Sequence, residues 1–471
     1  MKTKTIYKKT FFLGLKQRLC SGTLCACLLF TVGCAVTPYN EPDITQKLDY
    51  TAEVRESYNV DETWWQGYEN KELSALIDTA LANNPDYLKA ALNIEKELYR
   101  LNLATSDLFP TLSGSLGVSG QKGLNKGHES ATNFSGEFAL NYEADLYGKI
   151  KDARTAQEFE YQATFLDRQS AKLSLINSTI DLYFNLTYLN NAIKLAEQNI
   201  KSYQDTLKIT EQKYKSGKVD NLEVAQARQS LLSEKNKLLE LTTTFKEMEQ
   251  SLKNIVALKP NNSLGLKYEN LLDQKTLSVD MDVPLSVLAN RPDLMAAQYR
   301  LEKAFKNLNA QEKNYYPTVS LQGTISSSSN KARSTFDFPI VFGSIGIDLP
   351  FLDYNRVKNN IKISKADYEI TLIEFNDTLN QALNETAYYY FAYEKSREIF
   401  KNIEANYQNA RKITKYYKIR YDNGKAEFKD LLEAINKENI MRQELVAQKY
   451  QIIKYENSIY KATAGKYKRK K

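Results

Sequence analysis

The sequence predicts a mainly α-helical protein with a few β-strands, built from one structural unit that occurs twice. Three observations support this fold class. The chain resembles itself at an offset of 207 residues, the interval between Pro85 and Pro292. Each copy contains about 65 residues without proline or glycine, from 149 to 213 and from 356 to 420, as a very long helix requires. Each copy also contains two segments in which apolar and polar residues alternate, which is typical of strands.

The N-terminal residues are expected to be a targeting segment. Residues 1–33 carry six basic residues and no acidic one, and a largely apolar run covers 24–32. This order is typical of a secretory signal peptide, and the run is shorter than the ~20 residues of a membrane-spanning helix. We therefore expect residues 1–33 to be removed.

A lipid attachment site is predicted at Cys34. The residues before it, Thr31, Val32 and Gly33, resemble a bacterial lipobox, although threonine replaces the usual leucine. Ala35 follows, so no acidic retention residue opposes sorting to the outer membrane. The alternative is an ordinary signal peptide with a free thiol at Cys34. This covalent lipid is the only bound group that we expect, and no other cofactor is predicted.

Charge and residue counts argue against several function classes. The net charge is +7, but the leader carries six of these charges, so nothing favours nucleic acid as a partner. All four cysteines lie at or before Cys34, and the one histidine, His128, sits in a predicted loop. No Cys/His metal site and no nucleophile–histidine pair can therefore be built, and we expect no enzyme activity. The basic C-terminal residues 465–471 are expected to be a solvated tail.

The repeat sets the domain organisation. Matching positions in the two copies include Glu95-Lys96 with Glu302-Lys303, Pro110-Thr111 with Pro317-Thr318, Tyr183-Phe184 with Tyr390-Phe391, and Gly217-Lys218 with Gly424-Lys425. The register needs no gap, so we expect two copies of one unit. The copies cover 73–258 and 285–464; residues 34–72 precede them and a linker, 259–284, separates them.

Each copy has the same expected order of elements. A helix over 85–107 starts with proline, as helices tolerate. Strands are expected at about 111–122 and 131–145, and in the second copy at about 318–328 and 338–351. A long helix follows, and a shorter helix, 221–258 in the first copy, returns along it with coiled-coil spacing. The short first helix and the return helix, placed end to end, match the ~98 Å of the long helix.

The turns between the long and return helices are predicted at about 214–220 and 421–427. Gly217 and Gly424 occupy the same position in these turns. Glycine suits a tight turn between helices that needs a positive φ.

The strands suit a lipid-facing sheet. Four amphipathic strands per chain cannot close a barrel, and an open sheet edge in lipid would leave unpaired backbone groups. Closure would therefore need several chains. The alternative is a soluble sheet that packs on helices.

Several motifs resemble TolC-like outer-membrane efflux proteins, in the lipoprotein branch of OprM and NodT type. They are Trp64-Trp65 with Asn83-Asn84-Pro85-Asp86, Leu288-Ala289-Asn290-Arg291-Pro292-Asp293, Leu146-Tyr147-Gly148-Lys149, and Tyr421 with Gly424 and Asp430-Leu431-Leu432. The resemblance implies a homotrimer with a twelve-stranded barrel in the outer membrane of a Gram-negative bacterium. An α-helical coiled-coil tunnel would extend into the periplasm, with an equatorial region formed by parts of 40–72, 259–290 and the tail.

The same resemblance implies function and partners. Such a protein is the passive exit duct for drugs or other small toxic compounds in a tripartite, RND-type efflux system. Its partners would be outer-membrane lipid, a periplasmic adaptor and an inner-membrane pump. Protein secretion is the main alternative, and a structural coiled-coil lipoprotein is a weaker one. A periplasmic adaptor would need lipoyl-like segments, which the sequence lacks.

Gate residues follow from the same family. Its members use charged and aromatic residues at the periplasmic tip, including an aspartate ring. By motif position Asp430 is the ring candidate, and Glu223 takes its place in the first copy. Asp422, Arg420 and Tyr421 complete the candidate set. Their alternative role is that of solvated charges at helix ends.

Overall fold

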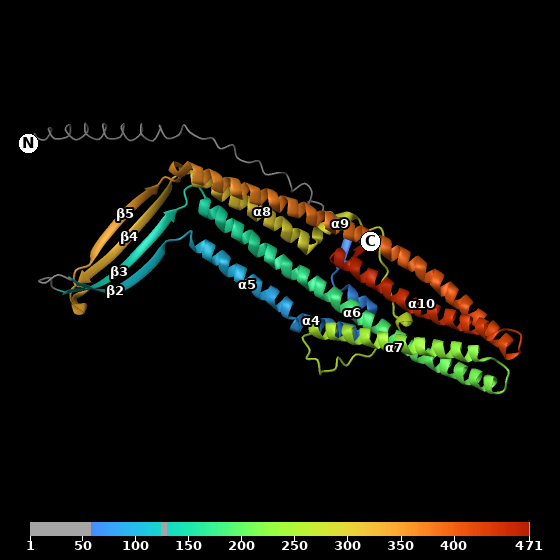
Figure 1. The fold of residues 1–471 in the computed structure, drawn as a ribbon. Helices are drawn as coiled ribbons and strands as arrows, with labels where there is room; N and C mark the ends of the chain where they lie inside the picture. Colours follow the sequence, from blue (N-terminus) through green and yellow to red (C-terminus); the bar gives the residue numbers. More distant parts are fainter. Residues whose placement is uncertain (1–57, 124–129, 471) are drawn as a thin grey trace, which may run out of the picture. The chain divides into compact units, whose positions relative to one another are not determined.

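A computed structural model describes residues 58–123 and 130–470, which belong to one compact unit, Leu48–Lys471. The first copy contains α5 Pro85–Ser106, β2 Thr111–Lys122, β3 Ser130–Ala144, α6 Lys149–Lys215 and α7 Asn221–Ile255. The second contains α8 Pro292–Glu312, β4 Thr318–Ser329, β5 Ile340–Asp348, α9 Tyr354–Asp422 and α10 Phe428–Ala462. The mainly helical, duplicated fold class is therefore confirmed (Figure 1).

Shorter elements flank and join these copies. They are β1 Tyr58–Asp61, α4 Lys71–Asn83, β6 Lys466–Arg469 and the 3₁₀ turns η1 Trp64–Tyr68, η2 Leu271–Asp273, η3 Leu285–Asn290, η4 Lys313–Tyr315, η5 Ala332–Ser334 and η6 Pro350–Asp353. The predicted signal peptide, the lipid site at Cys34 and His128 lie outside the described residues. No helix within 58–123 or 130–470 is both long and apolar enough to cross a membrane.

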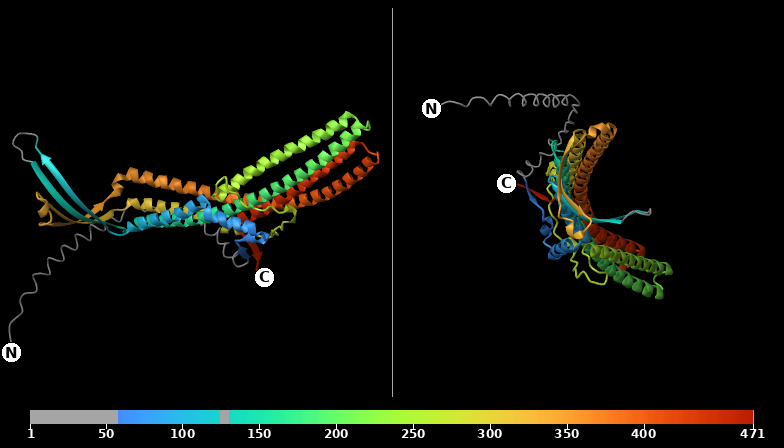
Figure 2. Two further views of the ribbon diagram at one scale, coloured as in Figure 1. Left: turned by 90° about the horizontal axis from the view of Figure 1, so that it is seen from below. Right: turned by 90° about the vertical axis from the view of Figure 1, so that its left-hand side faces the viewer.

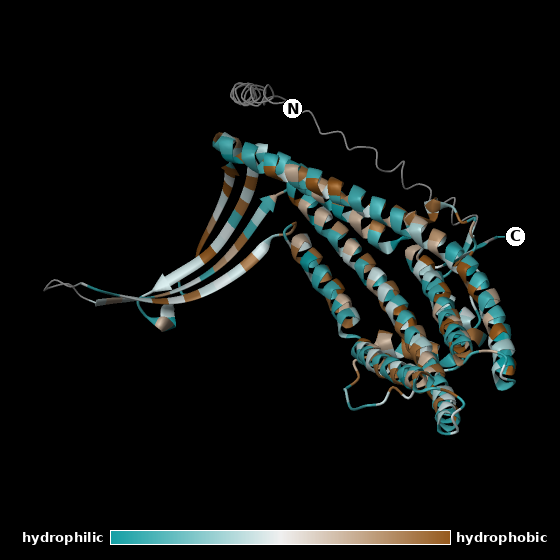
Figure 3. Ribbon diagram, turned by 45° about the vertical axis from the view of Figure 1, so that its right-hand side comes forward, coloured by the Kyte–Doolittle hydropathy of each residue, from teal (hydrophilic) through white to brown (hydrophobic). Residues whose placement is uncertain are grey.

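The four main strands form one antiparallel sheet in the order β2-β3-β4-β5. The two hairpins join through β3 and β4, where Tyr142 pairs with Leu321. Because side chains alternate along a strand, one face is apolar and the other polar. Figure 3 shows this alternation along the strands. Leu112 on the apolar face is 80% exposed, so no described residue covers that face there.

Strand β5 is shorter than the sequence pattern over 338–351 indicates. It covers Ile340–Asp348. Pro339 and Pro350 flank it, and proline has no N–H to donate to a sheet ladder. Pro350 instead begins the 3₁₀ turn η6.

In each copy, two shorter helices pack along one long helix. Helix α6 packs along both α5 and α7, and α9 packs along both α8 and α10. Asn84 Nδ2 donates a hydrogen bond to the Ile255 carbonyl oxygen at 2.9 Å, so the end of α7 meets the start of α5. Helix α6 also contacts α8 and α10, which joins the two copies. The sheet lies at one end of the helices and the two helical turns at the other (Figure 1).

The largest apolar core lies midway along the helices, and we call it the belt core. Its members include Trp64, Tyr68, Leu73, Ile77, Ile180, Phe184, Leu252, Leu277, Tyr393, Ile453 and Tyr460. They come from η1, α4, α6, α7, the linker, α9 and α10, so this core depends on segments distant in sequence. The linker and the N-terminal elements are held there.

Residues Lys466–Arg469 form a strand and not the solvated tail that was expected over 465–471. Strand β6 pairs antiparallel with β1, and Tyr58 lies opposite Arg469. Tyr467 is buried and packs with Val287 and Tyr58. The basic residues around Tyr467 made this segment look like a solvated tail. A count of charges does not reveal a short strand with one buried aromatic side chain.

Candidate functional site: the two helical turns

Both turns between the long and return helices have the same backbone geometry. Gly217 and Gly424 each adopt a φ of 69°. In the first turn, Lys218 N donates to Lys213 O at 2.9 Å, and in the second, Lys425 N donates to Arg420 O at 2.8 Å. These bonds close a Schellman-type helix end, whose left-handed residue is normally glycine. A Cβ at either glycine would meet nothing within 4 Å, so the backbone angle alone favours glycine.

Arg420 is engaged within its own turn. Its Nη2 donates to Lys425 O at 2.9 Å and its Nη1 to Tyr416 Oη at 2.8 Å. The hydrogen bond to Tyr416 raises the pKa of Arg420. Lys213 occupies the equivalent position in the first copy, but its side chain contacts the other turn and not its own. Its Nζ lies 3.6 Å from the centroid of the Tyr421 ring, a cation–π contact between the two turns.

A cleft of about 750 Å³ separates the two turns. Three of the gate candidates line it: Glu223, Tyr421 and Asp422. Arg420 and Asp430 do not. Within the described part of the chain, Glu223 Oε2 and Tyr421 Oη are buried without a hydrogen-bond partner. Burial, with the Asp220 charge, raises the pKa of Glu223, while Lys213 opposes the shift.

Apolar packing holds the two helical hairpins together beside this cleft. Phe428 is buried and packs against Tyr203 and Leu231 of the first hairpin, and we call these residues with Ala227 and Leu432 the tip cluster. The Tyr421 ring lies 5.6 Å from that of Phe428. Asn439 Nδ2 donates to Tyr203 Oη at 3.2 Å. Figure 2 shows the two hairpins side by side at this end.

Sequence reasoning missed Lys213, Phe428 and Tyr203 as tip residues. The repeat contained a signal for Lys213, because this residue occupies the same repeat position as the candidate Arg420. No comparable signal marked Phe428, since its partners come from the other copy.

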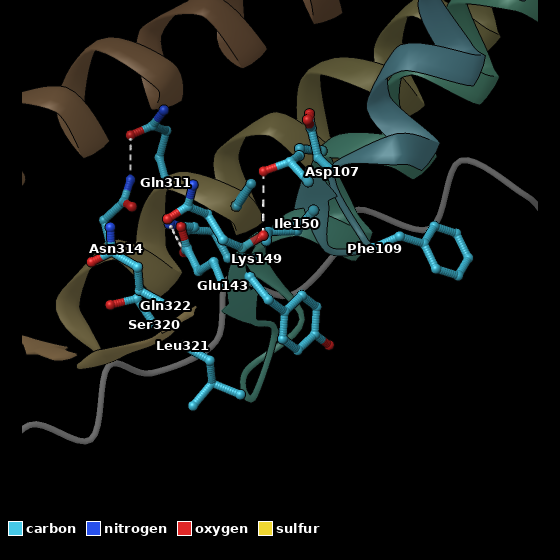
Figure 4. Close-up of a pocket in the computed structure, with 15 residues that line it drawn as sticks. Asp107, Phe109, Glu143, Lys149, Ile150, Gln311, Asn314, Ser320, Leu321 and Gln322 are labelled. Carbon is cyan, nitrogen blue, oxygen red and sulfur yellow. Dashed lines mark hydrogen bonds and ion pairs between the residues drawn. The ribbon is translucent and has the colours of Figure 1, made fainter. Parts of the chain in front are cut away.

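A second cavity lies where the strands meet the helices (Figure 4). It has a volume of about 650 Å³. Glu143 and Lys149 point toward one another there, with Oε1 and Nζ 2.8 Å apart. Asn141 and Gln322 line it from paired positions on β3 and β4, on the polar face of the sheet. Tyr142 and Leu321 also line the cavity, so its lining mixes polar and apolar side chains.

The residues within 58–123 and 130–470 form no cluster of three or more His, Cys, Asp or Glu side chains able to hold a metal ion. The described residues combine a sheet that has one polar face with long helices and a contact between the two turns at their tip.

The comparisons with known proteins agree with this architecture. Toxin and drug export protein A of Aggregatibacter actinomycetemcomitans is 37% identical over 419 residues, which cover 89% of this chain and 92% of the relative. Cation efflux system protein CusC of Escherichia coli K12 is 24% identical over 462 residues, covering 94% and 98%. The crystal structure of the CmeC outer membrane channel of Campylobacter jejuni shares the fold, with a TM-score of 0.80 at 23% identity over 92% of this chain and 94% of that one. Residues 76–258 and 283–465 both match the outer membrane efflux protein family, and the chain therefore belongs to that family.

Proposed function

We propose that the chain forms the passive exit duct of a tripartite efflux system, in which an RND-type inner-membrane pump supplies the energy and a periplasmic adaptor connects the two. As an outer membrane efflux protein, the chain acts at the outer membrane. The observation that carries the proposal is a four-stranded amphipathic sheet with two open edges, joined to helical pairs that end in tight turns.

The open edges support a closed barrel made by several copies. Strands β2 and β5 are the edges of the sheet. In lipid, unpaired backbone groups are too costly, so each edge needs a partner strand. Pairing β5 of one copy with β2 of the next would give twelve strands from three copies, with the polar face inside.

Exposed apolar side chains support the same homotrimer. They lie on α5 (Leu88, Leu92, Tyr99 and Leu103) and on α9 (Ile363, Ile370, Ile373 and Phe391). The spacing on α5 places its four residues on one side of the helix. Large exposed apolar surfaces mark contacts with other molecules, and we infer that these stripes pack between copies. The lipid on Cys34 would add an anchor in the outer membrane.

The gate is proposed to lie at the two helical turns. Three copies of Asp422 and Asp430 near one axis would repel each other or hold a cation, and so narrow the pore. Arg420 would keep the turn in shape, because its donors are bound to Lys425 and Tyr416. Glu223 and Tyr421 would act between the hairpins of one copy, where the contact of Lys213 with Tyr421 has to break on opening.

Single-channel conductance tests this gate. Asp422→Ala combined with Asp430→Ala should raise the conductance of the purified channel in planar bilayers. Asp367→Ala combined with Asp377→Ala, two exposed acids on α9 away from the turns, should leave it unchanged. An unaltered conductance in the first variant would rule out the acid constriction.

The cargo is proposed to be drugs or other small toxic compounds. The relative named for both toxin and drug export supports this class, and it also keeps protein secretion as the alternative. A structural coiled-coil lipoprotein is the weaker alternative, because it would not need the amphipathic sheet.

Susceptibility of a deletion strain tests the cargo. The strain, with and without the intact gene, is exposed to drugs, detergents and metal salts. Sensitisation that the intact gene reverses, and that a Cys34→Ala gene reverses poorly, would support anchored efflux. If the deletion makes the strain more sensitive to none of these compounds, proteins missing from its culture medium would point to secretion.

A further inference from the structure

A basic groove lies beside the belt core, between α9, α10 and the linker. Its volume is about 370 Å³. Leu277, Tyr393 and Phe400 form its apolar lining, and Arg397, Lys401 and Lys449 supply its cations. We call this set the belt groove. Glu404 is the one carboxylate among the lining residues, so the lining carries a net positive charge.

The cations of the belt groove lack ion-pair partners within residues 58–123 and 130–470. Lys449 is half-buried, and no carboxylate oxygen described there lies within 4.0 Å of its Nζ. Burial lowers the pKa of Lys449, and the more distant charges of Glu456 and Asp273 only oppose that shift. Arg397 lies over the Tyr393 ring at 5.6 Å. Lys449 is thus a half-buried cation without an ion pair, and the exposed Arg397 and Lys401 lie beside it, so the groove favours an anion from outside the chain.

The groove would stay open in an assembled duct. Tyr388 and Ile399, which are exposed and apolar, lie roughly 160° to 180° around α9 from Arg397. A second copy that covers the apolar side of α9 therefore leaves the basic side free. The linker, whose residues 276–278 form one wall of the groove, lies on that free side.

We propose that the belt groove binds carboxylate-bearing peptides of the periplasmic cell wall. This inference rests on the proposed function, because a duct that crosses the periplasm brings the belt to a fixed height within it. The groove has room for a residue-sized group with an apolar part and an acidic end. A folded protein partner would need a contact of about 800 Å² and about 20 residues on each side, whereas ten residues line this groove.

Cosedimentation with isolated cell-wall sacculi tests the proposal, using the purified full-length assembly in detergent. The wild type should sediment with sacculi at low salt and be released at about 0.3 M salt, where charges are screened. Arg397→Gln, Lys401→Gln and Lys449→Gln combined should weaken binding about tenfold or more. The matched control combines Lys412→Gln, Lys415→Gln and Lys418→Gln, which removes the same charge from α9, and should bind like the wild type.

Three outcomes would overturn the proposal. They are equal binding by the two triple variants, equal binding to sacculi stripped of peptides by an amidase or to vesicles of an anionic phospholipid, and binding that begins only after neutralising the chain's own acidic residues at 41–56. The last result would show that this segment fills the groove. Drug resistance, measured separately, should be the same in the triple groove variant as in the wild type. Loss of wall binding and failure of the exit-duct function are thus distinguishable.

Discussion

Arg291 Nη1 donates a hydrogen bond to the carbonyl oxygen of Ala462 at 3.2 Å, and this bond repeats the one between Asn84 and Ile255 at the same offset along the chain. In both copies the side chain before the helix-starting proline ties that helix to the last residue of the return helix. Arg291 also pairs with Asp293 at 2.7 Å and with Glu385 of α9 at 3.3 Å. The first copy thus joins its two helices through the amide side chain of Asn84 alone, whereas in the second copy Arg291 makes the same link and is also part of an ionic network.

Replacing Arg291 should cost more stability than replacing Asn84. Arg291 is buried, and Arg291→Ala leaves Asp293 and Glu385 without their cation, so we expect a loss of about 3 kcal/mol. Asn84→Ala removes one hydrogen bond and a helix cap, worth about 1 kcal/mol each. Denaturant unfolding of the purified protein measures both. Arg291→Lys should restore part of the loss, and equal losses for the two alanine variants would contradict the assigned network.

The turn glycines should be sensitive to backbone strain alone. Gly217→Ala and Gly424→Ala should each cost about 1 kcal/mol, because alanine disfavours a φ of 69°. Asn at these positions should cost less. The matched control is Gly323→Ala in β4, where a Cβ also meets nothing within 4 Å but the φ is not left-handed. Melting temperatures compare the variants, and a drop for Gly323→Ala as large as for the turn variants would refute the argument.

Glu456 should make stability depend on pH. It is fully buried, and accepts hydrogen bonds from Leu277 N at 3.0 Å and Tyr393 Oη at 3.2 Å. Burial raises the pKa of Glu456 from 4.5 to about 8. The folded state thus holds a proton that the unfolded state has released, and stability should fall as the pH rises from about 4.5 to 8.

Glu456→Gln provides the control for this pH effect. Glutamine can accept the bond from Leu277 but cannot ionise, so its denaturation midpoint should vary less between pH 5 and 8 than that of the wild type. Parallel pH profiles for the two proteins would show that Glu456 is not the group responsible.

The tip cluster should resist opening. Phe428→Ala removes the buried ring that joins the two hairpins, at a cost of about 3 to 4 kcal/mol. We expect more frequent opening and faster protease cleavage near residues 216–220. Phe338→Ala, an exposed ring near β5, should change neither. If Phe428→Ala opens as rarely and is cleaved as slowly as the wild type, contacts other than the tip cluster hold the closed state.

The sequence alone predicted the repeated features of the fold and the family. The offset from Pro85 to Pro292 recurs in the helix ends at Ile255 and Ala462, because the same local signals occur twice. The resemblance to TolC-like proteins is confirmed by the family match. Helices and strands of this kind rest on local periodicity and turn chemistry, which a single sequence displays.

What the sequence did not predict depends on contacts between distant segments. The role of Tyr467 follows from its partners Val287 and Tyr58, which no local pattern connects. The contact of Lys213 with Tyr421 likewise joins two copies of the repeat. The assignments of Asp422 and Asp430 to a constriction stay predictions, because a ring exists only between copies of the chain.

The pairing of β1 with β6 has a consequence for biogenesis. Tyr58 and Arg469 pair with each other although about 410 residues separate them along the chain. Closing so long a loop is slow, and it cannot begin before residues 466–469 have been synthesised. The pairing of β1 with β6 is therefore a late step of folding, and a chain without β6 would keep β1 unpaired.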